Sequence, residues 1–314
     1  MRELILRRAV ALVATLFLVS LLVFTVVRVL PGDPALLIMG TEGSPEAAAA
    51  LRRAMGLDRP ILVQYVEWLG GALRGDLGRS IQYDVAVGRL ILSRLTVTLP
   101  LTFLATAFML LTAIPLGVYA ATRHGRPADY LTMVLSQLGI AIPSFWAGLL
   151  LILLFAVRLG WVRAGGFDGW SAGLWPSVKA LLLPAFALGA VQAAILARTT
   201  RAAVLEVLRA DHVRTARAKG LGEGTVTWKH VVRNALLTIV TIVGLQLGQL
   251  LAGSIVLENV FYLPGLGRLA LGAISARDLP VVQGVVLLVA STVVTLNFVV
   301  DVLYTVLDPR IRYE

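Results

Sequence analysis

Residues 98–121, TLPLTFLATAFMLLTAIPLGVYAA, contain no charged side chain, and this stretch decides the class of fold. An α-helix rises 1.5 Å per residue, so roughly 20 apolar residues are needed to cross a bilayer core of about 30 Å. The stretch is long enough to cross, and it therefore predicts a transmembrane helix.

The rest of the chain repeats this pattern, which predicts an all-α polytopic membrane protein with six transmembrane helices. Apolar residues make up 58% of the sequence, charged residues 15%, and the mean hydropathy is +0.85. These values lie outside the usual range of soluble proteins. The predicted spans are residues 9–30, 98–121, 130–157, 180–197, 235–257 and 281–307.

The distribution of basic residues predicts that both termini lie in the cytoplasm. More than half of the 28 Lys and Arg residues fall in the amino end, the second and fourth connections and the carboxyl end. Basic residues in short connections are retained on the cytoplasmic side. The first connection, residues 31–94, carries seven Arg, but loops of about 60 residues cross the membrane largely regardless of charge. The net charge of +10 follows from this sorting, so nucleic-acid binding is not supported.

We interpret the first apolar run as a retained membrane anchor rather than a cleaved signal. It is longer than a usual signal core, and it continues into Val29-Leu30-Pro31-Gly32-Asp33 without a small-x-small cleavage pattern. Cysteine is absent from the chain, so disulfides and thiolate metal sites are excluded.

These spans divide the chain into residues 1–30, with the amino end and first span, an external loop at 31–94, and a permease-like core at 95–314. In the loop, Ser44 with Pro45 starts one short helix that Gly56 can end, and Pro60 starts a second. The second has one apolar face, which either lies on the membrane, caps a transport path or packs on neighbouring spans. The residues of this face are Ile61, Tyr65, Trp68, Leu69, Ala72 and Leu73. The shorter external loop carries Trp161, Trp170 and Trp175, which we interpret as interfacial anchors.

The sequence offers no candidate residues for an enzyme, and no cofactor or metal is expected in this chain. A phosphate-binding loop needs a Gly-Lys-Ser/Thr, but none of the three lysines follows a glycine. His124, His212 and His230 are isolated from one another and lack the spacing that holds zinc. No Gly-x-Ser-x-Gly elbow and no mid-membrane carboxylate pair is present.

An ion-coupled secondary carrier remains one alternative, because ionisable groups inside spans are functional candidates. The chain offers Arg28 and Glu258 near span ends and Asp301 about two turns from the inner end of the last span, and inverted repeats between the two halves are not evident. Neutral polar side chains can also face a wet translocation path, or they can form hydrogen bonds between helices. The candidates for the path are Gln137, Gln192, Gln246, Gln249 and Asn297.

Residues 211–237, DHVRTARAKGLGEGTVTWKHVVRNALL, form a basic polar segment between two apolar runs. Residues 198–218 favour a helix that continues inward from the fourth span, and Gly220-Leu221-Gly222 breaks it. A new helix near Thr225 leads back to the membrane. The result is a cytoplasmic hairpin, within about residues 198–234, whose tip can seat in a groove of a partner protein. Alternatively, the basic segment only fixes the topology.

This segment resembles the coupling loop of ABC importer permeases, in the dipeptide, oligopeptide and nickel branch. The usual form there is Tyr-Val-Arg-Thr-Ala-Arg-Ala-Lys-Gly-Leu, and residues 212–221 read HVRTARAKGL, with one difference. Residues 233–237, RNALL, also match, although Thr238 stands where the family often has Pro. Further matching markers lie at 28–34, 56–60, 258–268 and 308–312, so the resemblance covers nearly the whole chain.

The resemblance implies a type I permease in a prokaryotic cytoplasmic membrane. It also implies a homologous second permease, two cytoplasmic ATPases that bind ATP and Mg, and an external solute-binding protein. Peptides are the expected cargo, while nickel, glutathione and small oligosaccharides stay open, as does a scaffold role without a path. Gly220 would allow the turn, and Arg217 and Lys219 would offer charge to the ATPase. The residues expected to couple to the ATPase are Arg214, Thr215, Ala216, Arg217, Ala218, Lys219, Gly220 and Leu221.

Overall fold

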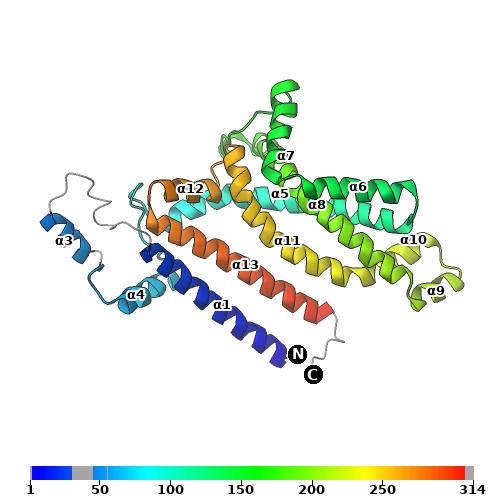
Figure 1. Cartoon of the computed structure of the whole chain (residues 1–314), viewed down its shortest axis with the longest axis horizontal. Helices are drawn as coiled ribbons and strands as arrows, with labels where there is room; N and C mark the ends of the chain where they lie inside the picture. Colours follow the sequence, from blue (N-terminus) through cyan, green and yellow to red (C-terminus); the bar gives the residue numbers. More distant parts are fainter. Residues whose placement is uncertain (1, 30–44, 55, 308–314) are drawn as a thin grey trace. The chain divides into compact units, whose positions relative to one another are not determined.

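The computed structural model describes residues 2–29, 45–54 and 56–307, and helices dominate these segments. They form two compact units (Figure 1): unit 1 contains residues 1–8, 98–263 and 295–314, and unit 2 contains residues 9–97 and 264–294. Among the described residues, the one β-type pairing outside helices is an isolated bridge between Arg79 and Ala86.

The long helices are joined by shorter ones. The α-helices are α1 (Arg2–Val29), α3 (Pro45–Ala54), α4 (Ile61–Leu73), α5 (Val87–Thr122), α6 (Pro127–Ala141), α7 (Ser144–Leu151), α8 (Leu174–Leu208), α9 (Asp211–Ala218), α10 (Glu223–Thr225), α11 (Arg233–Val260), α12 (Leu266–Ser275) and α13 (Leu279–Leu307). Two π-helical segments, Ile152–Arg158 and Val226–Val232, extend α7 and connect α10 to α11, and Trp170–Ala172 forms a 3₁₀ turn. Helix α5 begins inside the stretch that was assigned to the external loop, and α11 continues through Thr238.

Five helices in the described segments are long and apolar enough to span a membrane, and the number is six if one bent pair of helices counts as a single span. The third predicted span, at residues 130–157, is therefore not one straight helix, because α6 and the segment Ser144–Arg158 meet at 99°. Pro143 causes the break: a residue before proline avoids the helical region, and Ile142 is extended with φ −88° and ψ 119°. The continuous apolar composition of residues 130–157 predicts one helix, although Pro143 could have indicated the break.

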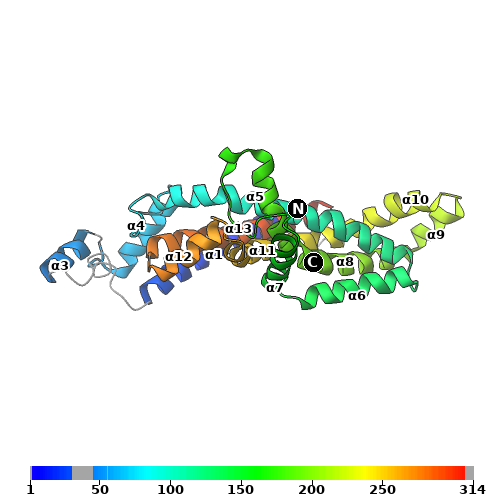
Figure 2. The ribbon, with the colours of Figure 1, turned by 90° about the horizontal axis from the view of Figure 1, so that it is seen from above.

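Helix α8 is the packing centre of unit 1, where it contacts α6, α7 and α11. Figures 1 and 2 show α6 running alongside it. Glycines permit a close approach: a Cβ on Gly117 of α5 would lie 2.6 Å from Thr200 Cβ, and one on Gly189 would lie 2.7 Å from the Ala105 carbonyl oxygen. Such small-residue contacts hold membrane helices together, because apolar side chains gain nothing by leaving lipid.

The two carboxylates considered for ion coupling both have partners within unit 1. Glu258 is fully buried on α11 and accepts a hydrogen bond of 2.6 Å from Thr98 Oγ1. Asp301 on α13 pairs with Arg8 of α1. The carboxylates therefore have structural contacts that the sequence did not indicate.

Unit 2 holds a separate apolar core formed by the start of α5, α12 and the start of α13. The buried Asp278 carboxylate accepts hydrogen bonds from the Ser80 hydroxyl and from the backbone N–H groups of Ile81 and Gln82. This carboxylate fixes the 78–86 segment beside the α12–α13 connection.

Helix α4 packs on α1, in agreement with one of the interpretations of its apolar face. The hydroxyls of Tyr65 and Ser20 lie 2.7 Å apart, and the Tyr65 ring contacts Phe17 and Phe24. Of the six predicted face residues, Ile61 and Leu73 are exposed instead. Gly56 has φ +66° and ends the turn after α3, as expected. Ser44 and the family-like sequence markers at residues 30–34 and 308–312 lie outside the described residues.

The glycine contact between α5 and α8 provides a direct test of this packing. Gly117→Ala should lower the stability of the folded protein by about 1–3 kcal/mol, because the new methyl group meets Thr200 and the backbone of Ala197. Thermal unfolding in detergent measures the effect. Gly272→Ala in α12 is the control, since its Cβ meets no atom within 4 Å, so the gain in helix propensity of up to about 1 kcal/mol is unopposed and the midpoint should not fall. Equal midpoints for the two variants would show that the close contact is not stabilising.

Candidate functional site: the hairpin between α8 and α11

The segment between α8 and α11 forms a hairpin whose first arm consists of two helices. The prediction of one helix over residues 198–218 is wrong, because α8 ends at Leu208 and α9 starts at Asp211. The backbone N–H groups of Arg209 and Ala210 donate hydrogen bonds to the carbonyl oxygens of Glu206 and Val207 in α8. Ala210 itself is extended, with φ −72° and ψ 148°. The Asp211 carboxylate lies in the first turn of α9, where the helix dipole favours negative charge.

Helix α9 is amphipathic and attached along one face. Val213 and Ala216 are buried, and α9 packs against the 226–232 segment, whose Val226 and Val231 are also buried. Of the eight residues predicted to contact the ATPase, Ala216 alone is buried, and the other seven are exposed. The hairpin therefore presents a polar face on an apolar support.

The tip of the hairpin is closed by a glycine and an ion pair. Gly220 has φ +76°, a left-handed conformation that costs other residues energy, and its N–H donates to the Arg217 carbonyl. The Arg217 guanidinium donates to both carboxylate oxygens of Glu223, at 2.8 and 3.1 Å. Arg217 thus holds the two arms together through Glu223, a role that differs from the predicted contact with the ATPase and that the matching segment 212–221 does not indicate.

A second ion pair fixes the base of the hairpin against α6. Arg201 Nη2 of α8 donates to Asp129 Oδ2 at 2.8 Å, and the Gly125 N–H donates to the same oxygen at 3.0 Å. His124 Nδ1 lies 3.0 Å from that oxygen, so this exposed histidine is not isolated from other polar groups. The Asp129 side chain is 3% exposed and that of Arg201 is 19% exposed. No local sequence pattern indicates this pair, because 72 residues separate its members.

An open groove of about 860 Å³ lies between the end of α5 and the hairpin. Arg123, Arg126 and Arg217 lie along it together with Glu223, and Trp228 and Leu116 contribute apolar surface. The groove is therefore both cationic and apolar.

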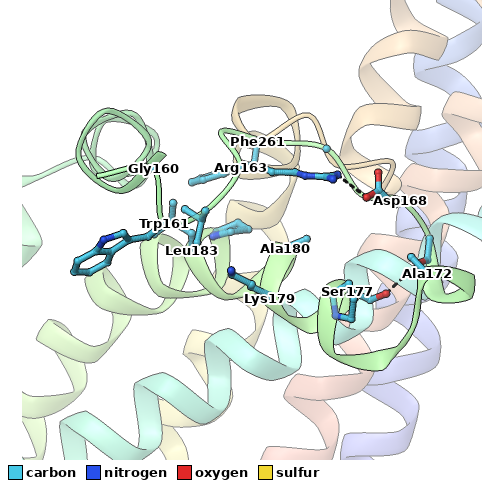
Figure 3. A pocket seen from close by; sticks show the side chains of 16 residues that line it. Gly160, Trp161, Arg163, Asp168, Ala172, Ser177, Lys179, Ala180, Leu183 and Phe261 are labelled. Carbon is cyan, nitrogen blue, oxygen red and sulfur yellow. Dashed lines mark hydrogen bonds and ion pairs between the residues drawn. The ribbon is translucent and has the colours of Figure 1, made fainter. Parts of the chain in front are cut away.

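A smaller pocket of about 340 Å³ lies at the opposite end of α8 (Figure 3). Its loop rests directly on α11, because Gly166 N–H donates to the Phe261 carbonyl and a Cβ on Gly165 would lie 2.4 Å from that oxygen. In the pocket wall, Arg163 pairs with Asp168, whereas Lys179 has no polar partner in the described segments. The predicted anchors Trp161 and Trp175 are exposed, and Trp170 is half-buried.

Of the five polar residues predicted for the path, Gln192 and Gln246 meet each other. Gln246 is buried on α11 and its Nε2 donates to the Gln192 carbonyl of α8 at 3.0 Å, which is a hydrogen bond between helices. Gln137, Gln249 and Asn297 are exposed, so their role in the path stays a prediction. Among residues 2–29, 45–54 and 56–307, no group of three or more His, Asp or Glu side chains could hold a metal ion.

Comparison with known proteins identifies the family. Residues 113–313 match the family described as "Binding-protein-dependent transport system inner membrane component", and residues 1–102 match the N-terminal part of such membrane components. The chain belongs to this family. It is therefore a multi-pass membrane permease that works with other subunits of a binding-protein-dependent transporter, as the resemblance of its coupling segment implied.

Relatives of similar length share the whole chain. A putative peptide transport system permease protein of Brucella abortus (strain 2308) is 42% identical over 314 residues, which is 100% of both chains. The corresponding protein of Brucella suis biovar 1 (strain 1330) is also 42% identical over 314 residues and 100% of both chains. A glutathione transport system permease protein of Escherichia coli O6:H1 is 43% identical over 310 residues, or 99% of each chain.

The buried ion pair at the base of the hairpin should be important for stability. Asp129→Asn leaves the partly exposed Arg201 charge without its counter-ion, and this should cost about 1–3 kcal/mol of unfolding free energy. Chemical unfolding of the purified protein measures the cost. Asp211→Asn is the matched control, because the Asp211 carboxylate is exposed and its Arg214 contact is 3.5 Å long. Similar small effects of both substitutions would contradict a structural role for Asp129.

Proposed function

We propose that this chain is one of the two permease subunits of an ATP-driven importer for short peptides. In this proposal two cytoplasmic ATPase subunits bind ATP and Mg, and an external solute-binding protein delivers the peptide to the paired permeases. The observation that carries the proposal is the hairpin: a polar face held on a buried apolar support and closed at its tip by Gly220 and the Arg217–Glu223 pair.

The hairpin is suited to transmit a push because it is braced at both ends. Its tip is closed by an ion pair, and its base is attached to α6 through Asp129 and Arg201. Movement of α9 would therefore be passed to α8 and, through the 226–232 segment, to α11. Closure of the ATPases on ATP would supply the movement, and reorientation of the long helices would open the path to alternate sides.

The orientation in this proposal follows from the basic residues of the hairpin and of the α5–α6 connection. Arg123, Arg126, Arg209, Arg214 and Lys219 all lie at this end of unit 1. Positive-inside sorting then places this end, and both chain termini, in the cytoplasm. The pocket beside Lys179, at the other end of α8, would face the side from which the binding protein delivers its solute.

Peptide cargo is supported by the relatives, whose names refer to peptide and glutathione transport. Glutathione is itself a modified tripeptide, so the two names describe one chemical class. Nickel chelates and small oligosaccharides are the other solutes that the sequence pattern left open, and no relative described above refers to them.

Disruption of the hairpin tip should uncouple transport from ATP hydrolysis. In Gly220→Ala the left-handed conformation becomes strained by about 1–2 kcal/mol, and Arg217→Ala releases Glu223. We expect the double variant to assemble with its partner subunits and to lose at least about tenfold in ATP-dependent dipeptide uptake into proteoliposomes. Gly222→Ala is the control, since Gly222 has φ −61° and open space around its Cα.

Unchanged uptake by the double variant would mean that the hairpin is not the coupling element. A chain that purifies without an ATPase, yet moves peptides in vesicles under an ion gradient, would support the secondary carrier instead.

Labelling of single cysteines can distinguish a path-lining subunit from a scaffold, because the chain has no cysteine of its own. Asn297 and Val299 are both exposed on α13, but two residues turn a helix by about 200°, so they face opposite ways. We expect Asn297→Cys in the assembled transporter to react with a water-soluble thiol reagent and Val299→Cys to stay unreactive. Equal protection of both would favour the scaffold.

A further inference from the structure

We propose that the groove between the end of α5 and the hairpin binds an anionic phospholipid from the cytoplasmic leaflet. The inference rests on the proposed function in one respect, since that function places the hairpin in the cytoplasm. All of the groove residues belong to unit 1. The evidence consists of the charge of the groove, the order of its side chains and its depth along α5.

The charge of the groove is suited to a phosphate. Arg217 is already engaged by Glu223, but Arg123 and Arg126 have no acidic partner in the part of the chain that the structure describes. The Arg123 guanidinium lies 4.5 Å from the centroid of the Tyr119 ring, so this cation is held in position by the aromatic face. The buried acid of the same connection, Asp129, is engaged by Arg201 and cannot neutralise these arginines.

The side chains along the groove follow the order of the parts of a phospholipid. Arg123 directly follows α5 and Arg126 precedes α6, Tyr119 lies one turn further into α5, and Leu116 and Pro115 lie about another turn deeper in this apolar helix, while Trp228 lines the hairpin side. Leu116 is 49% exposed and Trp228 is 56% exposed, so both offer surface to an occupant. Aromatic side chains favour the level of the headgroups, and basic pockets between membrane helices on the cytoplasmic side bind anionic headgroups.

The depth of the groove favours a lipid over a segment of a partner protein. From Thr122 to Pro115 the groove follows α5 for about 10 Å, at 1.5 Å per residue. A protein loop that reached Leu116 would carry backbone N–H and C=O groups into the hydrocarbon, where each unsatisfied group costs several kcal/mol. A phospholipid places its phosphate at the arginines and its acyl chain beside Leu116 without that cost.

A lipid in this groove would contact the coupling hairpin as well as α5. Arg217, Glu223 and Trp228 form the hairpin side of the groove, whereas Arg123 and Tyr119 form the α5 side. An anionic headgroup would therefore bridge the two sides and hold the hairpin against the membrane-spanning bundle. Transport should then depend on anionic lipid beyond any general effect of membrane charge.

The experiment uses the complete transporter, purified in detergent, and phosphatidylglycerol as the probe. Native mass spectrometry should detect one tightly retained phosphatidylglycerol in the wild-type complex. The double variant Arg123→Gln with Arg126→Gln should bind it about 30-fold more weakly, because each cation near anionic headgroups contributes roughly 1 kcal/mol. Arg233→Gln is the control: this exposed arginine lies at the same end of unit 1 but does not line the groove, and retention should be unchanged.

A second readout identifies what occupies the groove. A fluorophore on Leu116→Cys should be quenched by phosphatidylglycerol brominated in its acyl chains, and not by brominated phosphatidylcholine at the same mole fraction. Equal lipid retention in the double variant and the Arg233 control would overturn the proposal. A photo-crosslink from position 116 to an ATPase subunit would overturn it in favour of a protein occupant. If the wild-type complex retains its lipid but shows no ATP-dependent uptake, the importer function fails and the lipid site does not.

Discussion

The close approach of α8 to its neighbours is the constraint on which the rest of unit 1 depends. Gly117 of α5, Gly139 of α6 and Gly253 of α11 each lie so near α8 that a Cβ would come within 3 Å of it. Burial of apolar surface does not drive helices together in lipid, so tight packing between small residues must do so. Because α8 continues directly to the hairpin, the same contacts determine where the candidate coupling element lies.

Polar interactions add to this packing, and they lie at the ends of the helices. Arg201 and Asp129 join α8 to α6 beside the hairpin, and the Gly166 N–H joins the opposite loop to the Phe261 carbonyl at the end of α11. The ends of the long helices are thereby fixed, while their exposed apolar sides remain available for lipid or a second subunit. A hairpin that is attached in this way can transmit movement to the long helices that it connects.

The sequence predicted most helices and turns, but it did not predict which side chains contact one another. Apolar runs located the spans, and Gly220 correctly indicated the turn, because a glycine between two helical stretches has a local cause. The kink at Pro143 and the break at residues 209–210 were also local, but continuous apolar or helix-favouring composition hid them. Glu223, Asp129 and Asp278 gained their importance from contacts that depend on how the chain folds back.

The sequence by itself determined that this protein is a helical membrane permease, since span length, charge bias and the 212–221 segment are properties of neighbouring residues. The family matches confirmed that conclusion over nearly the whole chain. Only the tertiary structure decided which groups meet: Arg201 with Asp129, Gln246 with the backbone of Gln192, and Arg123 with the groove beside the hairpin. Contacts between residues far apart in the chain depend on the packing of whole helices, and no local pattern encodes them.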